Sequence, residues 1–314
     1  MTSDATSALR HVRLLRRSSG IGGAPTQSHR DVLLLLAPCV VYLVAFSIFP
    51  LCYSLAISFM DYDSRADEFS WIGIGNYKEL FGNDIFWQAV KNTLVFTFGG
   101  VAIQVVLGTA LALFFNQRLR GAWIARGILI LPMLITPVVV GVMWRALLNP
   151  EWGMANWLAE RAGLENVGWL SNPKVALLTL LLVDTWQWTP FVFVVVYARL
   201  QALPQDVFEA GEIDGTTFFQ KLRHLTLPLL APAIVFAAVF RAIDAFRTFD
   251  LVFGLTNGGP GQSTTTLSFQ AFRNSFGGFF RYGYASAIAY VMVIAAAIGM
   301  TLLFKFVRIR RAAY

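Results

Sequence analysis

The chain has few charged residues for its length. Only 14% of its 314 residues are Asp, Glu, Lys or Arg, whereas 56% are hydrophobic. A composition of this kind excludes a soluble domain of this size and indicates a membrane protein. The net charge of +7 does not indicate a nucleic-acid partner, because the basic residues bracket the apolar runs.

Cysteine and histidine are also scarce, with two and three residues. Cys39 and Cys52 both lie in the first apolar run, at a spacing suited to neither a disulfide nor a zinc site, and we interpret them as buried core residues. His11, His29 and His224 lie in separate polar segments and offer no metal-ligand set. The sequence has no Walker motif and no catalytic constellation, so we expect no metal, no cofactor and no ATP hydrolysis by this chain.

Six apolar runs are long enough to cross the hydrocarbon core, which takes about 20 helical residues. They cover residues 32–59, 89–115, 122–147, 175–200, 227–255 and 280–307. The first run is too long for a signal-peptide core, so we expect it to be retained. We therefore predict an all-α membrane protein with six transmembrane helices. Its membrane domain covers residues 32–308, between a flexible basic tail at 1–31 and a basic C-terminus at 309–314.

The distribution of basic residues predicts the orientation. With the N-terminus inside, fifteen Lys and Arg residues fall in cytoplasmic segments and six in outer segments. The positive-inside rule then places both termini in the cytoplasm, as a multi-pass protein of the bacterial inner membrane. The acidic outer segment 61–88 carries Trp71, Tyr77 and Trp87, which we interpret as an interfacial belt, with docking of a soluble partner as the alternative.

The polar segment at residues 201–226 separates the fourth and fifth apolar runs and is predicted to be cytoplasmic. Its first helix should begin at about Gln205, and Asp214 with Gly215 should form a turn. Thr217 and Gln220 then fit the capping box of a second helix. The pattern predicts a helix-turn-helix whose apolar surface needs a partner; the alternative is a loop packed on its own bundle.

Ionisable side chains also lie inside two of the apolar runs, where they are costly and indicate a pathway or a buried partner. Asp184 lies in the fourth run, and Arg241 lies in the fifth at a similar depth. Helical spacing gathers polar and aromatic groups on two faces, as a sugar site would require. The predicted site residues are Asp184, Gln187, Trp188 and Phe191 on one face, and Arg241, Asp244, Ala245 and Thr248 on the other.

Two interpretations of the charges in the fifth run remain open. Arg241 with Asp244, and Arg247 with Asp250, could be ion pairs that only neutralise each other in the bundle. If Arg241 instead faces a cavity, the substrate could be an anionic sugar derivative.

Two motifs resemble those of a known family. The first matches, at the same spacing, the EAA loop of permease subunits in binding-protein-dependent ABC importers, and consists of Glu209, Ala210, Gly211, Asp214, Gly215, Leu227, Pro228 and Pro232. The second, LTNGGP at residues 255–260, resembles a segment of the maltose-transporter-like sugar permeases. The resemblance covers residues 32–308. Gly211 and Thr216 depart from the usual EAA pattern.

This resemblance implies a type I ABC importer permease fold and an assembly that imports a sugar or related polyhydroxylated solute. The implied partners are a second homologous permease subunit, an ATPase subunit dimer that binds the ATP, an extracytoplasmic solute-binding protein and membrane lipid, with no nucleic acid. The family's solute contacts fall at or near Phe191, Arg241, Ala245 and Thr248. The implied ATPase-coupling residues are Glu209, Ala210, Gly211, Asp214, Gly215, Thr216 and Thr217.

Two other functions remain alternatives. An ion-coupled secondary transporter would act alone and would use Asp184 as its coupling carboxylate. A membrane-embedded enzyme would need a catalytic set of residues, which the sequence does not supply.

Overall fold

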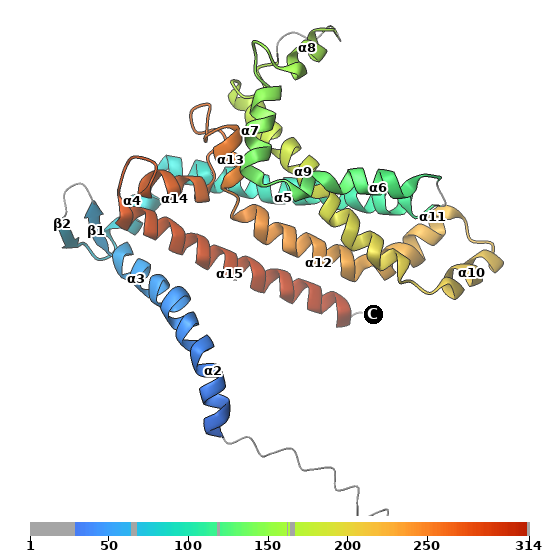
Figure 1. The fold of residues 1–314 in the computed structure, drawn as a ribbon, viewed down its shortest axis with the longest axis horizontal. Coiled ribbons are helices and arrows are strands. Elements are labelled where there is room, and N and C mark those ends of the chain that lie inside the picture. Colours follow the sequence, from blue (N-terminus) through green and yellow to red (C-terminus); the bar gives the residue numbers. More distant parts are fainter. Residues whose placement is uncertain (1–28, 64–67, 118–119, 162, 164–166, 313–314) are drawn as a thin grey trace, which may run out of the picture. The chain divides into compact units, whose positions relative to one another are not determined.

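The computed structural model describes residues 29–63, 68–117, 120–161, 163 and 167–312, and the described residues are mostly helical (Figure 1). The predicted basic tail at 1–31 lies almost entirely outside them. The chain divides into two compact units, residues 1–54 and 55–314, which are considered separately.

The first unit holds α2 (His29–Leu43), the π-helix η1 (Val44–Ile48) and the beginning of α3 (Phe49–Ser58). Together, Leu35–Ser58 are long and apolar enough to span a membrane. Cys39 and Cys52 are both exposed, so the prediction that they are buried is wrong. The hydrophobicity of this run does not indicate a core, because a membrane-spanning helix exposes apolar side chains to lipid rather than to water.

The described part of the second unit contains four further helices that could each cross a membrane: α5 (Asp84–Phe115), α9 (Pro173–Gln201), α12 (Leu227–Phe246) and α15 (Tyr282–Ala312). Side-chain caps define two of their starts. Asn83 accepts a hydrogen bond from the backbone of Ile85 at 2.9 Å, and Asn172 accepts one from Lys174 at 3.0 Å. α5 packs along α9, and α12 packs against both.

The third predicted run, 122–147, is not one straight helix. It consists of α6 (Ala122–Ile130), the 3₁₀ turn η2 (Leu131–Leu134) and α7 (Pro137–Leu147), with a bend of 100° between the two parts. Thr136 is extended, with a ψ of 140°, because a residue before proline is driven out of the helical region, and Ile135 is also extended, with a ψ of 136°. The described residues thus hold five candidate spans and one bent pair, in agreement with six spans if the bent pair counts as one.

The fifth predicted run, 227–255, is broken as well. α12 ends at Phe246, and a short helix, α13 (Asp250–Leu255), begins after a three-residue break. In this break the backbone carbonyl of Thr248 accepts a hydrogen bond from the hydroxyl of Thr266 at 3.1 Å, so the unwound backbone is partly satisfied by its neighbour. The prediction of a continuous helix here is therefore wrong.

Shorter elements cover the ends of the second unit. The hairpin β1 (Met60–Asp63) and β2 (Glu68–Trp71), which the sequence did not predict, pairs Met60 with Trp71, and α4 (Gly75–Phe81) follows it. α8 (Met154–Arg161) lies between α7 and α9, and α14 (Leu267–Ser275) precedes α15. At the opposite end of the unit from the hairpin, α10 (Gln205–Ile213), α11 (Phe218–Lys221) and η3 (Leu222–Thr226) connect α9 to α12 (Figure 1).

Candidate functional site

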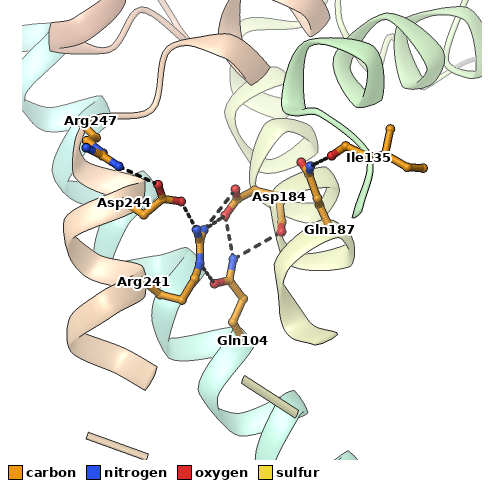
Figure 2. Close-up of polar contacts among 7 residues, drawn as sticks. All are labelled: Gln104, Ile135, Asp184, Gln187, Arg241, Asp244 and Arg247. Atoms are coloured by element: carbon orange, nitrogen blue, oxygen red, sulfur yellow. Dashed lines mark hydrogen bonds and ion pairs between the residues drawn. The ribbon is translucent and has the colours of Figure 1, made fainter. Parts of the chain in front are cut away.

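Four polar side chains from three long helices form a buried network in the second unit (Figure 2). Arg241 of α12 is fully buried, and its terminal nitrogen Nη2 lies 3.1 Å from the carboxylate of Asp184 on α9, which is 3% exposed. Its other terminal nitrogen, Nη1, pairs with Asp244. The Nε of Arg241 donates to Gln104 of α5 at 2.9 Å, and Gln104 in turn donates to Asp184 at 2.6 Å. Each charge is thus matched by an opposite charge or an amide, as burial requires.

A cavity of about 310 Å³ lies beside this network, at the break between α12 and α13. Its lining combines carboxylates, a guanidinium, a hydroxyl and aromatic rings: Pro137, Asp184, Trp188, Asp244, Ala245, Arg247, Thr248, Phe249, Asp250 and Leu251. The volume falls within the range of small-molecule sites, and polar groups beside aromatic faces suit a compound with many hydroxyls.

The break in α12 and the bend before α7 both help to form the cavity. Pro137 contributes from the start of α7, and Thr248 contributes from the unwound segment. Irregular backbone at membrane depth is tolerated where it is buried in protein or lines a cavity, which agrees with its position here.

Five of the eight predicted site residues line the cavity: Asp184, Trp188, Asp244, Ala245 and Thr248. The structure places the other three elsewhere. Gln187 is fully buried and donates to the backbone carbonyl of Ile135 at 2.9 Å. The ring of Phe191 lies 4.9 Å from that of Phe240, and Arg241 lies behind the wall, with its guanidinium 4.5 Å from the ring of Trp188.

The ion pairs resolve part of the question that the sequence left open. Arg241 forms an ion pair with Asp244, as the ion-pair interpretation predicted. Within the described residues, the ion pair of Arg247 is also with Asp244, at 3.6 Å, rather than with Asp250. Arg241 is therefore not free, and the condition on which an anionic substrate depended is not met in this structure.

Gln104 is the member of the network that sequence reasoning missed. It lies 80 residues before Asp184 and 137 before Arg241, on a helix from which no site residue was expected. The available signal was its polarity, since an uncharged amide in the middle of a long apolar run needs a buried partner.

The loop between α9 and α12 is the predicted helix-turn-helix. α10 begins at Gln205, and Gly215 supplies the turn with a φ of +68°, in the left-handed region. The backbone N–H of Thr217 donates to the Gln220 side chain at 2.8 Å, and the hydroxyl of Thr217 accepts from the Gln220 backbone at 3.4 Å. These bonds form the expected capping box, which starts α11.

The two departures from the EAA pattern contact each other. The hydroxyl and the backbone N–H of Thr216 both donate to the carbonyl of Gly211, at 2.6 and 3.1 Å. A Cβ added at Gly211 would lie 3.1 Å from Leu225 and 3.3 Å from the Thr216 hydroxyl. Gly211 and Thr216 thus fit each other, and their departure from the EAA pattern leaves the turn intact.

The helix-turn-helix exposes apolar and acidic surface. Ile213, Phe218 and Phe219 are 87%, 68% and 77% exposed, and Glu209 is exposed on α10. A groove of about 680 Å³ between α10 and the following helical segment is lined by Asp206, Val207, Gly211, Asp214, Thr216, Gln220, His224 and Leu225. An exposed apolar surface of this kind, with polar residues around it, is typical of a protein interface.

Residues 104–311 match the family described as "Binding-protein-dependent transport system inner membrane component". The chain belongs to this family. It is thus a multi-pass permease subunit of an ABC importer and not an enzyme. This assignment replaces the alternative of an ion-coupled transporter that acts alone.

Two curated relatives align with most of the permease. It is 33% identical to the trehalose/maltose transport system permease protein MalF of Thermococcus litoralis, over 88% of this chain and 94% of the relative. It is also 33% identical to the sulfoquinovosyl glycerol transport system permease protein SmoG of Agrobacterium fabrum, over 82% of this chain and 84% of the relative.

A solved structure shares the fold of the permease. The crystal structure of a bacterial ABC transporter involved in the import of the acidic polysaccharide alginate superposes with a TM-score of 0.76 at 23% identity, over 90% of this chain and 96% of that chain. The predicted fold class, an all-α permease of the type I ABC importer kind with a helix-turn-helix loop, is confirmed.

Proposed function

We propose that this permease carries a sugar or related polyhydroxylated solute through the cavity beside the α12–α13 break. The observation that carries the proposal is the cavity itself, which joins carboxylates, a hydroxyl and aromatic rings at the break between α12 and α13. The carboxylates can accept hydrogen bonds from sugar hydroxyls, and Trp188 can lie against the apolar face of a ring. The named cargoes of two relatives, trehalose or maltose and sulfoquinovosyl glycerol, support this class of solute.

The proposed assembly contains four kinds of subunit: this permease, a second homologous permease, an ATPase dimer that binds the ATP, and an extracytoplasmic solute-binding protein. The family description supports the binding protein. The excess of basic residues in the predicted cytoplasmic segments supports a bacterial inner-membrane location with both termini inside and a permease domain over residues 32–308.

In this assembly the helix-turn-helix transmits movement from the ATPases. Glu209 is proposed as the charged contact, on the helix that also holds Ala210 and Gly211, and the turn at Asp214 and Gly215 presents the loop to a cleft on the ATPase. Thr216 and Thr217 maintain its shape, through the bond to Gly211 and the capping box. The exposed apolar side chains of the loop support this role, because they need a protein partner.

Uptake by the reconstituted assembly tests the proposal. The permease is purified with the ATPases, second permease and binding protein encoded beside it, and ATP-dependent uptake into liposomes is measured for labelled di- and monosaccharides. We expect Trp188→Ala to raise the half-saturating concentration about tenfold, which corresponds to ~1.4 kcal/mol of binding, while the ATPases still copurify.

Trp123→Ala is the matched control, since Trp123 is 75% exposed on α6 and away from the cavity. It should leave uptake close to that of the unmodified permease. Equal effects of the two substitutions would show that the cavity does not contact the solute.

A further inference from the structure

The side chains around Arg241 hold its guanidinium out of the cavity. Arg241 donates from Nε to Gln104 at 2.9 Å, from Nη1 to Asp244, and from Nη2 to both carboxylate oxygens of Asp184 at 3.1 and 3.3 Å. The face of its guanidinium is covered by Trp188 at 4.5 Å. With no exposed surface, Arg241 cannot contact a solute unless this network opens.

The charged side chains that line the cavity are mostly acidic. Asp184, Asp244 and Asp250 all line the cavity, and Arg247 is the basic residue among the lining side chains. Arg247 forms an ion pair with Asp244 at 3.6 Å, and its side chain is 73% exposed. When Arg241 is included, three formal negative charges face two positive ones.

We propose that Asp184 is a specificity-determining residue, and Gln104 a positioning residue, that together hold Arg241 away from the solute, so that the permease accepts uncharged sugars and excludes acidic ones. This inference rests on the proposed function and adds the charge class of the substrate. A carboxylate or sulfonate in the cavity would lose its hydration beside Asp244 and Asp250, with no unpaired guanidinium to replace the lost water. The hydroxyls of a neutral sugar can donate to the same carboxylates.

The test compares two glycosides that differ in one group. Methyl glucoside carries a CH₂OH where methyl glucuronide carries a carboxylate, and equilibrium binding of each labelled compound is measured on the complete, nucleotide-free transporter complex in detergent. We expect the wild-type complex to prefer the glucoside at least tenfold. Asp184→Asn removes one of the two carboxylates that hold Arg241 and should narrow that preference at least tenfold, because the guanidinium can then meet the carboxylate of the glucuronide.

Two further variants separate charge selection from a general loss of folding. Asp184→Asn combined with Arg241→Gln removes the released cation and should restore the preference for the glucoside. Asp84→Asn makes the same chemical change at an exposed site in the first turn of α5 and should leave the ratio unchanged. If Asp184→Asn does not assemble, Asp244→Asn removes the other carboxylate on Arg241, at a side chain that is 31% exposed, and should narrow the preference as well.

Gln104→Leu tests the positioning role, because it leaves the net charge unchanged. Narrowing of the preference in this variant supports that role, and an unchanged preference overturns it. If the wild-type complex binds the two glycosides equally, or if Asp184→Asn leaves the ratio of their affinities unchanged, charge selection is overturned but the proposed solute site is not. A wild-type complex that binds neither glycoside overturns the proposed solute site itself.

Discussion

Glu79 and Arg281 connect two parts of the chain that are 202 residues apart. The guanidinium of Arg281 donates to both carboxylate oxygens of Glu79, at 2.7 and 2.6 Å, and so joins α4 to the residue that precedes α15. These hydrogen bonds from Arg281 hold the pKa of Glu79 below its usual value of 4.5. Because the two side chains are 46% and 38% exposed, solvent screening limits the stabilisation to about 0.5 kcal/mol.

This ion pair predicts a small pH-dependent effect on stability. Because the pKa of Glu79 is lower in the folded state, its contribution is fully present above pH 4.5 and is lost as the pH falls through the lowered value. Glu79→Gln should therefore lower the melting temperature in detergent by about 1 °C near neutral pH. The difference between variant and wild type should shrink as the pH falls below 4.5. A difference that grows on acidification would contradict this assignment.

At the same scale, the sequence allowed part of the buried network to be predicted. Asp184, Arg241 and Asp244 could be grouped because ionisable residues are rare inside apolar runs and helical spacing places them at similar depths. Gln104 could not be assigned, since an uncharged residue in a long span has several candidate partners. The direction in which the Arg241 side chain points could not be predicted either, because it depends on how α5 and α9 pack against α12 rather than on the spacing within one helix.

Among the elements, α5 and α9 approach closely at Gly108. A Cβ on Gly108 would lie 2.6 Å from the Cβ of Val192 and 3.0 Å from the backbone nitrogen of Phe193. Small residues allow membrane helices to come into backbone contact, and any side chain here would push α9 away. This contact helps to fix α9, which carries both Asp184 and Trp188.

Gly108→Ala should therefore destabilise the permease by about 1–3 kcal/mol through overpacking, even though Ala is the better helix former. Gly127→Ala is the matched control, because no atom lies within 4 Å of the added Cβ on α6. It should be neutral or stabilising by up to ~1 kcal/mol. Thermal aggregation in detergent, followed by size-exclusion chromatography, measures both. The prediction fails if the Gly108 variant is as stable as the Gly127 variant.

The elements also show where prediction from the sequence reached its limit. Hydropathy located every long apolar helix, and the capping residues of the loop at 201–226 gave its helices within a residue or two. The break after Phe246 was missed, because hydropathy records burial in lipid and does not distinguish a continuous helix from a broken one. In the structure a residue distant in sequence supports the broken form, since the hydroxyl of Thr266 donates to the carbonyl of Thr248.

Considered as a whole, the second unit links the cavity to the helix-turn-helix through α9 and α12. α12 follows η3 directly at Leu227 and reaches Arg241 fourteen residues later, a distance of about 21 Å along a helix. α9 carries Asp184 and continues to the start of the loop. We propose that α9 and α12, joined by the buried ion network, move together, so that a displacement of the loop changes access to the cavity.

This arrangement predicts that coupling and solute binding are separable. Glu209→Ala removes the proposed charged contact but leaves the cavity and the capping box unchanged. Uptake by the reconstituted assembly should fall more than tenfold, equivalent to at least ~1.4 kcal/mol of lost coupling, while expression and solute binding persist. Glu160→Ala, at an exposed carboxylate on α8, is the control and should transport normally. Normal uptake by the Glu209 variant would contradict the proposed role of Glu209 in coupling.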